Sequence, residues 1–190
     1  HHPVFENYPV YDDMPEPGRD PAGPVVYVGD VTEIRGALTL VEAAGRSDTT
    51  DRLEFIGRCS DQLSADLRGL ATELGVQIDL RGWMPHNEAM ASVTAASVGV
   101  APLHDVPNYR RSLPTKTLEY LALGVPVVAS DLPGTRRVIG GLPGVQLVPP
   151  GDAGALARAL DTVDGDPSIA EAAMAGPADV RTTFRWPADE

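Results

Sequence analysis

The chain has 190 residues, of which 43% are hydrophobic, and its formal net charge is −12 at pH 7. This length suffices for one domain with a sizeable core, and the negative charge argues against nucleic acid and anionic membrane surfaces as partners. The single cysteine, Cys59, excludes an internal disulfide and fits a reducing cytoplasm. Because no apolar run reaches the length of a membrane span, we expect no direct membrane insertion by this domain.

The first 24 residues differ in composition from the rest of the chain. They are rich in Pro, Asp, Glu and Gly, which is typical of a linker or an edge segment. His1 and His2 are interpreted as the remnant of an expression tag. Residues 25–190 are therefore predicted to form the folded domain.

From Val25 onward, short apolar runs alternate with amphipathic segments. The predicted strands are, in chain order, residues 25–29, 53–57, 77–82, 97–103, 126–130 and 145–148. The predicted helices are residues 36–44, 61–74, 87–95, 115–123, 135–139 and 152–160. This alternation predicts an α/β fold, a Rossmann-like parallel six-stranded sheet with helices on both faces. Ligands of such sheets bind beyond the carboxyl ends of the strands, where the longest predicted loop, residues 104–115, leads into a helix.

That helix carries the most informative pair of residues. Lys116 stands in its first turn, where a cation opposes the helix dipole unless an anion joins it. Backbone N–H groups at a helix start also favour an anion. Glu119 follows on the same face, one turn deeper, in a helix that is otherwise mainly apolar. A phosphate site beside a carboxylate that can accept two hydroxyl hydrogen bonds is suited to a sugar nucleotide.

Several segments together resemble a known family. They are YVGDVTEIRG, LEFIG, LRGWMP, VGVAPL, LPTKTLEYLALGVPVVASDLPG and VQLVPPGD. The chain is similar in them to the C-terminal, donor-binding half of a GT-B glycosyltransferase of the retaining GT4 type, glycosyl transferases group 1. Residues 184–190 look like the start of that family's final crossover helix. The resemblance implies that an N-terminal acceptor-binding domain is missing and is a partner of this half.

The resemblance also implies roles for particular residues. Lys116 and Arg35 would hold the diphosphate and act as the catalytic cations, and Glu119 would bind the ribose. Arg111 stands where relatives carry a first motif glutamate, so the sequence departs from the family there. The implied donor-binding set is Glu119, Lys116, Arg35, Gly29, Trp83, Pro114, Thr115 and His104. No metal and no cofactor are expected, since these cations and the helix start take the place of a metal.

The function implied is transfer of a sugar, with retention, from a nucleoside-diphosphate sugar to an acceptor held by the missing domain. The product would be a polysaccharide or glycoconjugate, made in the cytoplasm or at the inner face of the membrane. We expect the isolated domain to be inactive. Two alternatives remain, a sugar-nucleotide 2-epimerase of the same architecture and a non-catalytic nucleotide-binding or scaffolding domain. A dinucleotide dehydrogenase is disfavoured because no strand is followed by G-x-G-x-x-G.

Plainer structural interpretations stay open for these residues. Lys116 and Glu119 could form an ordinary surface ion pair, and Arg35 could be solvated. His104 could simply order its loop, and Trp83 could be core or a half-buried lid.

Four other residues are given structural interpretations or left open. His86 is interpreted as the residue that begins a helix, and Cys59 as an inert thiol outside any zinc site. Arg110 and Arg111 are either cations of the cleft or an exposed basic pair.

Overall fold

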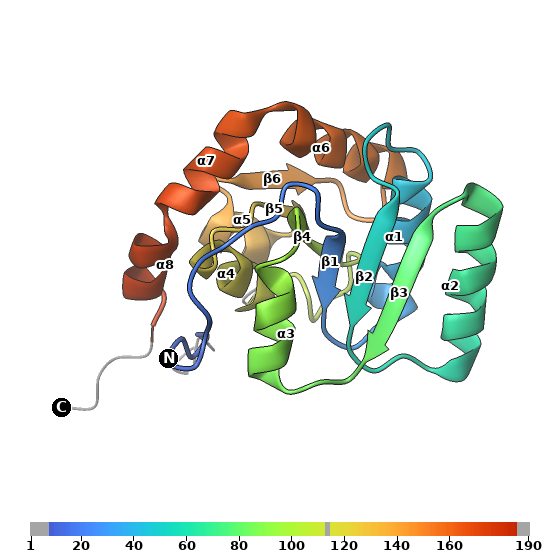
Figure 1. The fold of residues 1–190 in the computed structure, drawn as a ribbon, viewed down its shortest axis with the longest axis horizontal. Helices are drawn as coiled ribbons and strands as arrows, with labels where there is room; N and C mark the ends of the chain where they lie inside the picture. Colours follow the sequence, from blue (N-terminus) through green and yellow to red (C-terminus); the bar gives the residue numbers. More distant parts are fainter. Residues whose placement is uncertain (1–7, 113–114, 186–190) are drawn as a thin grey trace.

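A computed structural model describes residues 8–112 and 115–185 of the chain. Its centre is one six-stranded sheet in the order β3-β2-β1-β4-β5-β6, and every pair of neighbours is parallel (Figure 1). The strands are β1 (Val25–Val28), β2 (Arg52–Ile56), β3 (Gln77–Gly82), β4 (Val98–Ala101), β5 (Val127–Ser130) and β6 (Val145–Val148). The predicted fold class is confirmed. Strands β1 to β3 extend the sheet in one direction, and β4 to β6 extend it in the other, starting beside β1. Open parallel sheets bind ligands at such a switch point, here between β1 and β4.

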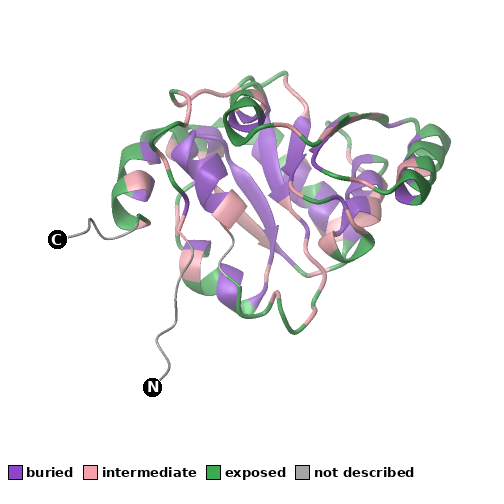
Figure 2. Ribbon diagram, turned by 90° about the horizontal axis from the view of Figure 1, so that it is seen from below, coloured by how far each residue is buried: buried purple, intermediate pink, exposed green. Residues whose placement is uncertain are grey.

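Helices cover both faces of the sheet. One face packs against α1 (Ala37–Ala44), α2 (Asp61–Leu74) and α6 (Ala153–Gly165). The other packs against α3 (His86–Val93), α4 (Thr115–Ala122), α5 (Pro133–Ile139) and α8 (Pro177–Thr183). A short 3₁₀ turn, η1 (Glu33–Arg35), precedes α1, and α7 (Pro167–Ala175) leads from α6 to α8. Purple, buried strands therefore lie between helices whose outer surfaces are green and exposed (Figure 2).

The sequence determines the ends of α2 by ordinary capping chemistry. Ser60 caps its start, because the Ser60 side chain accepts a hydrogen bond from the backbone N–H of Leu63. Gly75 ends it in the left-handed conformation, at a φ of 72°. Leu63 and Leu67 lie on the buried face of the helix. The leucine spacing therefore predicted the full extent of α2.

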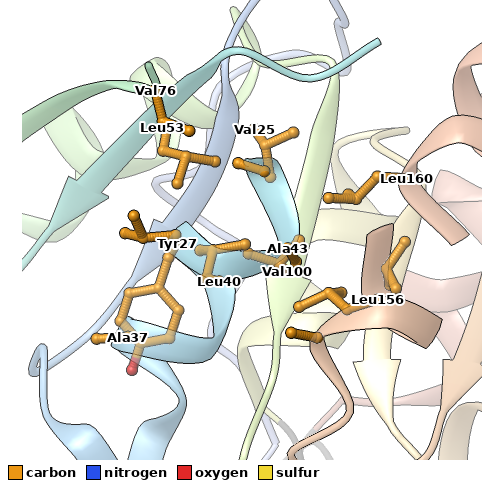
Figure 3. Packing of buried hydrophobic residues seen from close by; sticks show 14 of the residues in the cluster. Val25, Tyr27, Ala37, Leu40, Ala43, Leu53, Val76, Val100, Leu156 and Leu160 are labelled. Atoms are coloured by element: carbon orange, nitrogen blue, oxygen red, sulfur yellow. The ribbon is translucent and has the colours of Figure 1, made fainter. Parts of the chain in front are cut away.

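On the face of the sheet covered by α1, a hydrophobic core lies between the strands β1, β2 and β4 and the helices α1 and α6. Figure 3 shows Leu40 of α1 among Tyr27, Val100 and the α6 residues Leu156 and Leu160. Leu40 has no exposed surface, and burial of a side chain of this kind stabilises the fold by about 1.5–3 kcal/mol. This core holds α1 against β1, and so holds the turn between them in place.

The C-terminal part of the chain differs from the prediction. Helix α6 continues five residues beyond the expected end at Leu160, and α7 and α8 were not expected. Phe184, expected to begin a final helix, instead follows the end of α8 with a φ of −111° and a ψ of 58°, which is not helical. Residues 186–190 of that expected helix lie outside the described residues.

The part of the N-terminal segment that the structure describes is packed against the domain. The backbone N–H of Gly18 donates to the carbonyl of Leu123 at 2.9 Å, and Arg19 Nε donates to the carbonyl of Ser97 at 2.8 Å. Tyr11 packs against the core on the α4 face. In Figure 1 this blue segment runs past α4 before it enters β1. Within the described residues, no helix has the length and apolar character needed to cross a membrane.

Candidate functional site

Two hollows meet at the carboxyl ends of the strands, and they share Arg35 and Lys116. The larger hollow, of about 480 Å³, lies between the turn after β1 and the start of α3, and its lining includes Gly29, Trp83 and His86. The smaller, of about 360 Å³, lies between β4 and the loop before α4. Its polar lining comes from Tyr27, Tyr109, Asn108, Ser112, Thr115 and Thr117. The two shared cations therefore separate two compartments that differ in lining.

Gly29 is the point at which the two cations converge. Its φ is 136°, which disfavours any side chain, and a Cβ there would lie 2.5 Å from Lys116 Cε. The same Cβ would lie 3.1 Å from Lys116 Nζ and 3.4 Å from Arg35 Nη1. Glycine thus lets an ammonium and a guanidinium lie directly against the backbone at the end of β1.

Helix α4 is tied to the end of β1 by a buried hydrogen bond. The backbone N–H of Val28 donates to the phenol oxygen of Tyr120 at 2.9 Å. Gly99 in β4 makes room for the ring, because a Cβ there would lie 2.4 Å from Tyr120 Cδ2. Tyr120 has no exposed surface. Since Lys116 and Glu119 precede it on the same helix, this contact sets their distance from the turn after β1.

Burial and charge together set the protonation of the two cations. Burial lowers the pKa of Lys116, and the nearby Arg35 lowers it further, against the attraction of Glu119 and Asp30. Burial also works to lower the pKa of Arg35, but the phenol groups of Tyr27 and Tyr109 outweigh it and leave that pKa raised. Arg35 Nη2 lies 3.9 Å from Asp30 Oδ2. An anion between the two cations would relieve their mutual repulsion.

Glu119 lines neither hollow, but it is buried behind His86, which lines the larger one, and pairs with it. Its carboxylate Oε1 lies 3.8 Å from His86 Nε2, and the Glu119 side chain is 12% exposed. Burial raises the pKa of Glu119, while His86 and Lys116 act in the opposite direction. Lys116 and Glu119 form no ion pair with each other within 4.0 Å. The alternative interpretation, that they are an ordinary surface ion pair, is therefore wrong.

The other expected donor-binding residues are placed differently. Trp83 lines the larger hollow and is 67% exposed, so its indole forms a rim and is not core. Thr115 lines the smaller hollow. His104 lies outside both linings, because its Nε2 is hydrogen-bonded to Thr39 Oγ1 at 3.0 Å and orders the loop against α1. Pro114 lies outside the described residues.

The two basic residues before α4 do not line either hollow. Arg110 forms a two-pronged ion pair with Asp105, with Nη2 donating to Oδ2 at 2.8 Å, and Arg111 is exposed. Burial raises the pKa of the Cys59 thiol. Within residues 8–112 and 115–185, no group of three or more His, Cys, Asp or Glu side chains is suited to a metal ion.

Sequence reasoning missed His86 as part of this site. It begins α3 as expected, yet its imidazole also reaches the carboxylate of Glu119. The two residues are 33 positions apart, and no local pattern links them. The sequence predicted no strand order, and it is the observed order that brings the helices after β3 and β4 to the same face of the sheet.

The fold and the site define the chain as a Rossmann-like α/β protein with paired cations at the end of its first strand. It belongs to the glycosyl transferases group 1 family, whose model matches residues 23–165. A phosphatidyl-myo-inositol mannosyltransferase of Mycobacterium leprae is 30% identical over 147 residues, which are 75% of this chain and 39% of that protein. The chain thus spans well under half the length of this relative.

Solved structures support the same placement. Sucrose-phosphate synthase from Thermosynechococcus elongatus superposes with a TM-score of 0.72 at 28% identity, over 94% of this chain and 46% of that one. Anabaena Alr3699/HepE, solved in complex with UDP and glucose, has a TM-score of 0.70 at 18% identity, over 86% of this chain and 45% of that one. The second likeness concerns the fold alone.

Proposed function

We propose that the chain binds the donor of a retaining glycosyltransferase of the GT4 type, a nucleoside-diphosphate sugar, and that a second domain holds the acceptor. The observation that carries the proposal is the convergence of Lys116 and Arg35 on the backbone of Gly29. The chain as a whole carries a net charge of −12, so these cations form a local exception. Two adjacent, partly buried cations are costly to maintain unless an anion joins them, and a diphosphate is such an anion.

The same two cations would support the chemistry. When the glycosidic bond to the donor phosphate breaks, negative charge develops on the departing diphosphate. Lys116 and Arg35 would stabilise that charge from fixed positions, which is how preorganised groups lower a barrier. Under this proposal they supply the positive charge that a metal supplies in other phosphate sites, so neither a metal nor another cofactor is required.

The two hollows suit the two ends of such a donor. Glu119 stands three residues after Lys116, which is about 4.5 Å along a helix axis, and its buried carboxylate can accept hydrogen bonds from ribose hydroxyls. Because Glu119 pairs with His86, which lines the larger hollow, the nucleoside would occupy that hollow, beside Trp83. The glycosyl group would occupy the smaller hollow, whose lining includes the phenol of Tyr109. The UDP and glucose bound by Alr3699/HepE are in keeping with such a ligand.

Calorimetric titration of nucleoside diphosphates, and of the matching nucleosides, tests the proposal. Lys116→Ala should weaken diphosphate binding by about 1.5–3 kcal/mol, because a charge-assisted hydrogen bond is lost, and should leave nucleoside binding nearly unchanged. Arg68→Ala is the matched control, since it removes one exposed cation from α2, a residue that lines neither hollow. Equal losses for diphosphate and nucleoside would show that Lys116 supports the fold and not the phosphate.

The placement of the acceptor on another domain has its own test. If the reaction takes place between two domains, the 190-residue chain should bind a nucleoside diphosphate and yet transfer no sugar. Transfer is measured as release of nucleoside diphosphate from its sugar in the presence of candidate acceptors. Robust transfer by this chain alone would place the acceptor site within it.

A further inference from the structure

His86 is the one cleft-lining histidine among the described residues, and the proposed function gives it no role. It is the first residue of α3, and its Nε2 lies 3.8 Å from Glu119 Oε1. The imidazole is 51% exposed, whereas the Glu119 side chain is 12% exposed. His86 thus stands at the mouth of the larger hollow, between solvent and a buried carboxylate.

The buried carboxylate needs help to stay ionised. An ionised carboxylate accepts hydrogen bonds at both oxygens. In the protonated acid one oxygen carries a hydrogen and acts as a donor, so the group accepts fewer hydrogen bonds. Burial favours the protonated form of Glu119 and so raises its pKa. Binding of two ribose hydroxyls therefore requires neighbouring groups that favour the ionised form.

The groups that face Glu119 come from three elements. Lys116 lies on the same helix, but its ammonium is directed at Gly29. Tyr11, from the N-terminal segment, has a buried hydroxyl that is uncharged at neutral pH, and burial raises its pKa further. Tyr120 is likewise a neutral phenol. Among the described residues, His86 is thus the basic side chain in direct reach of the Glu119 carboxylate.

We propose that His86 is a positioning residue for nucleotide binding, whose imidazole keeps the Glu119 carboxylate ionised and held beside the larger hollow. This inference rests on the proposed function and adds a pH dependence to the ribose end of that site. As pH falls, Glu119 takes up a proton and the ribose hydroxyls lose their acceptor. His86 acts to lower the pKa of Glu119 and so opposes that loss. Without His86, the loss begins at a higher pH.

The test compares a ribonucleoside diphosphate with its 2′-deoxy analogue. Both ligands carry the same diphosphate, so the ratio of their dissociation constants cancels phosphate titration and isolates the ribose contact. The ratio is measured by calorimetry between about pH 5 and about pH 8, where imidazole groups titrate. His86→Ala should reduce the ribose preference about two- to fivefold at the acidic end, the range for a partly exposed ion pair.

Three further variants sharpen the interpretation. His86→Asn removes the charge and should behave like His86→Ala, whereas His86→Lys restores a cation and should restore the preference. Asn87→Ala changes the neighbouring exposed residue of α3 and should follow the parent profile. Thermal melting should be nearly the same for all four, so a change in the ratio reports on binding and not on folding.

Two results would overturn the inference, and they are distinguishable. If His86→Ala keeps the parent ratio at every pH, His86 only begins α3, and the proposed function stands. If the parent itself shows no ribose preference at any pH, the assignment of Glu119 to the ribose fails together with this inference. Diphosphate binding through Lys116 would in that case still be tested separately by Lys116→Ala.

Discussion

Tyr120→Phe should destabilise the protein through a single hydrogen bond. The tyrosine ring is fully buried, and its phenol oxygen accepts the backbone N–H of Val28 at 2.9 Å. Phenylalanine keeps the ring and its packing against Gly99. The change therefore removes one oxygen and leaves the N–H of Val28, at the buried end of β1, without its partner.

The size of the effect follows from that unpaired donor. A buried donor without a partner costs about 1–3 kcal/mol, and the unchanged ring adds almost no cavity cost. For a chain of this length, each kcal/mol lowers the melting temperature by about 2–4 °C. Loss of the tether should also loosen α4 against the turn after β1. Because Lys116 and Glu119 both stand on α4, affinity should fall for the nucleoside as well as for the diphosphate.

Urea denaturation followed by circular dichroism measures the stability change. Tyr11→Phe is the matched control, because the Tyr11 hydroxyl is buried without a hydrogen-bond partner among the described residues. The same chemical change should there be neutral or slightly stabilising. A loss below about 0.5 kcal/mol for Tyr120→Phe, within the range of ordinary surface changes, would show that the Val28–Tyr120 contact does not hold α4 in place.

Two further substitutions test the site. Gly29→Ala should displace the end of the Lys116 side chain, since its Cβ would lie 2.5 Å from Lys116 Cε; calorimetry should show a large loss of diphosphate affinity with nucleoside affinity kept. Glu119→Gln should leave stability near neutral pH unchanged or higher, because burial disfavours the carboxylate. The raised pKa of Glu119 means that the parent gains stability as pH falls through that pKa. The melting temperature of the parent, relative to that of Glu119→Gln, should therefore rise as the pH is lowered. If the difference between the two melting temperatures were the same at every pH, burial of the Glu119 charge would be contradicted.

Much of the fold could be predicted because apolar periodicity and caps act locally. The leucine stripe of α2 and the turn at Gly75 are properties of one segment, and the prediction of Asp61–Leu74 is confirmed. Short apolar runs predicted the inner strands, because such strands of a covered parallel sheet are buried on both faces. The edge strands β3 and β6 were also predicted, although they are less buried. Helices α7 and α8 escaped prediction. Both are short, begin with a proline and bury only two residues each, so their apolar pattern is weak.

The site was only partly accessible from the sequence. Lys116 and Glu119 share one helix, so their spacing alone placed them on one face. Arg35 was assigned by resemblance, and the structure shows that it reaches the same glycine as Lys116. The contact between His86 and Glu119 depends on α3 and α4 packing side by side on one face of the sheet. Such a contact follows from strand order and helix packing, which single-segment patterns do not encode.

The central claim is that a diphosphate binds at Gly29, between Lys116 and Arg35. Its most direct test is a nuclear magnetic resonance titration of the ¹⁵N-labelled chain with a nucleoside diphosphate. The backbone amide resonances of Gly29, Arg35 and Lys116 should all shift as the nucleoside diphosphate is added. The loop of residues 47–50, held by Asp161 before the start of β2 at the opposite end of the strands, should stay unchanged. Shifts confined to Thr32, Arg58 and Cys59, which line an adjoining cavity of about 630 Å³, would contradict the account.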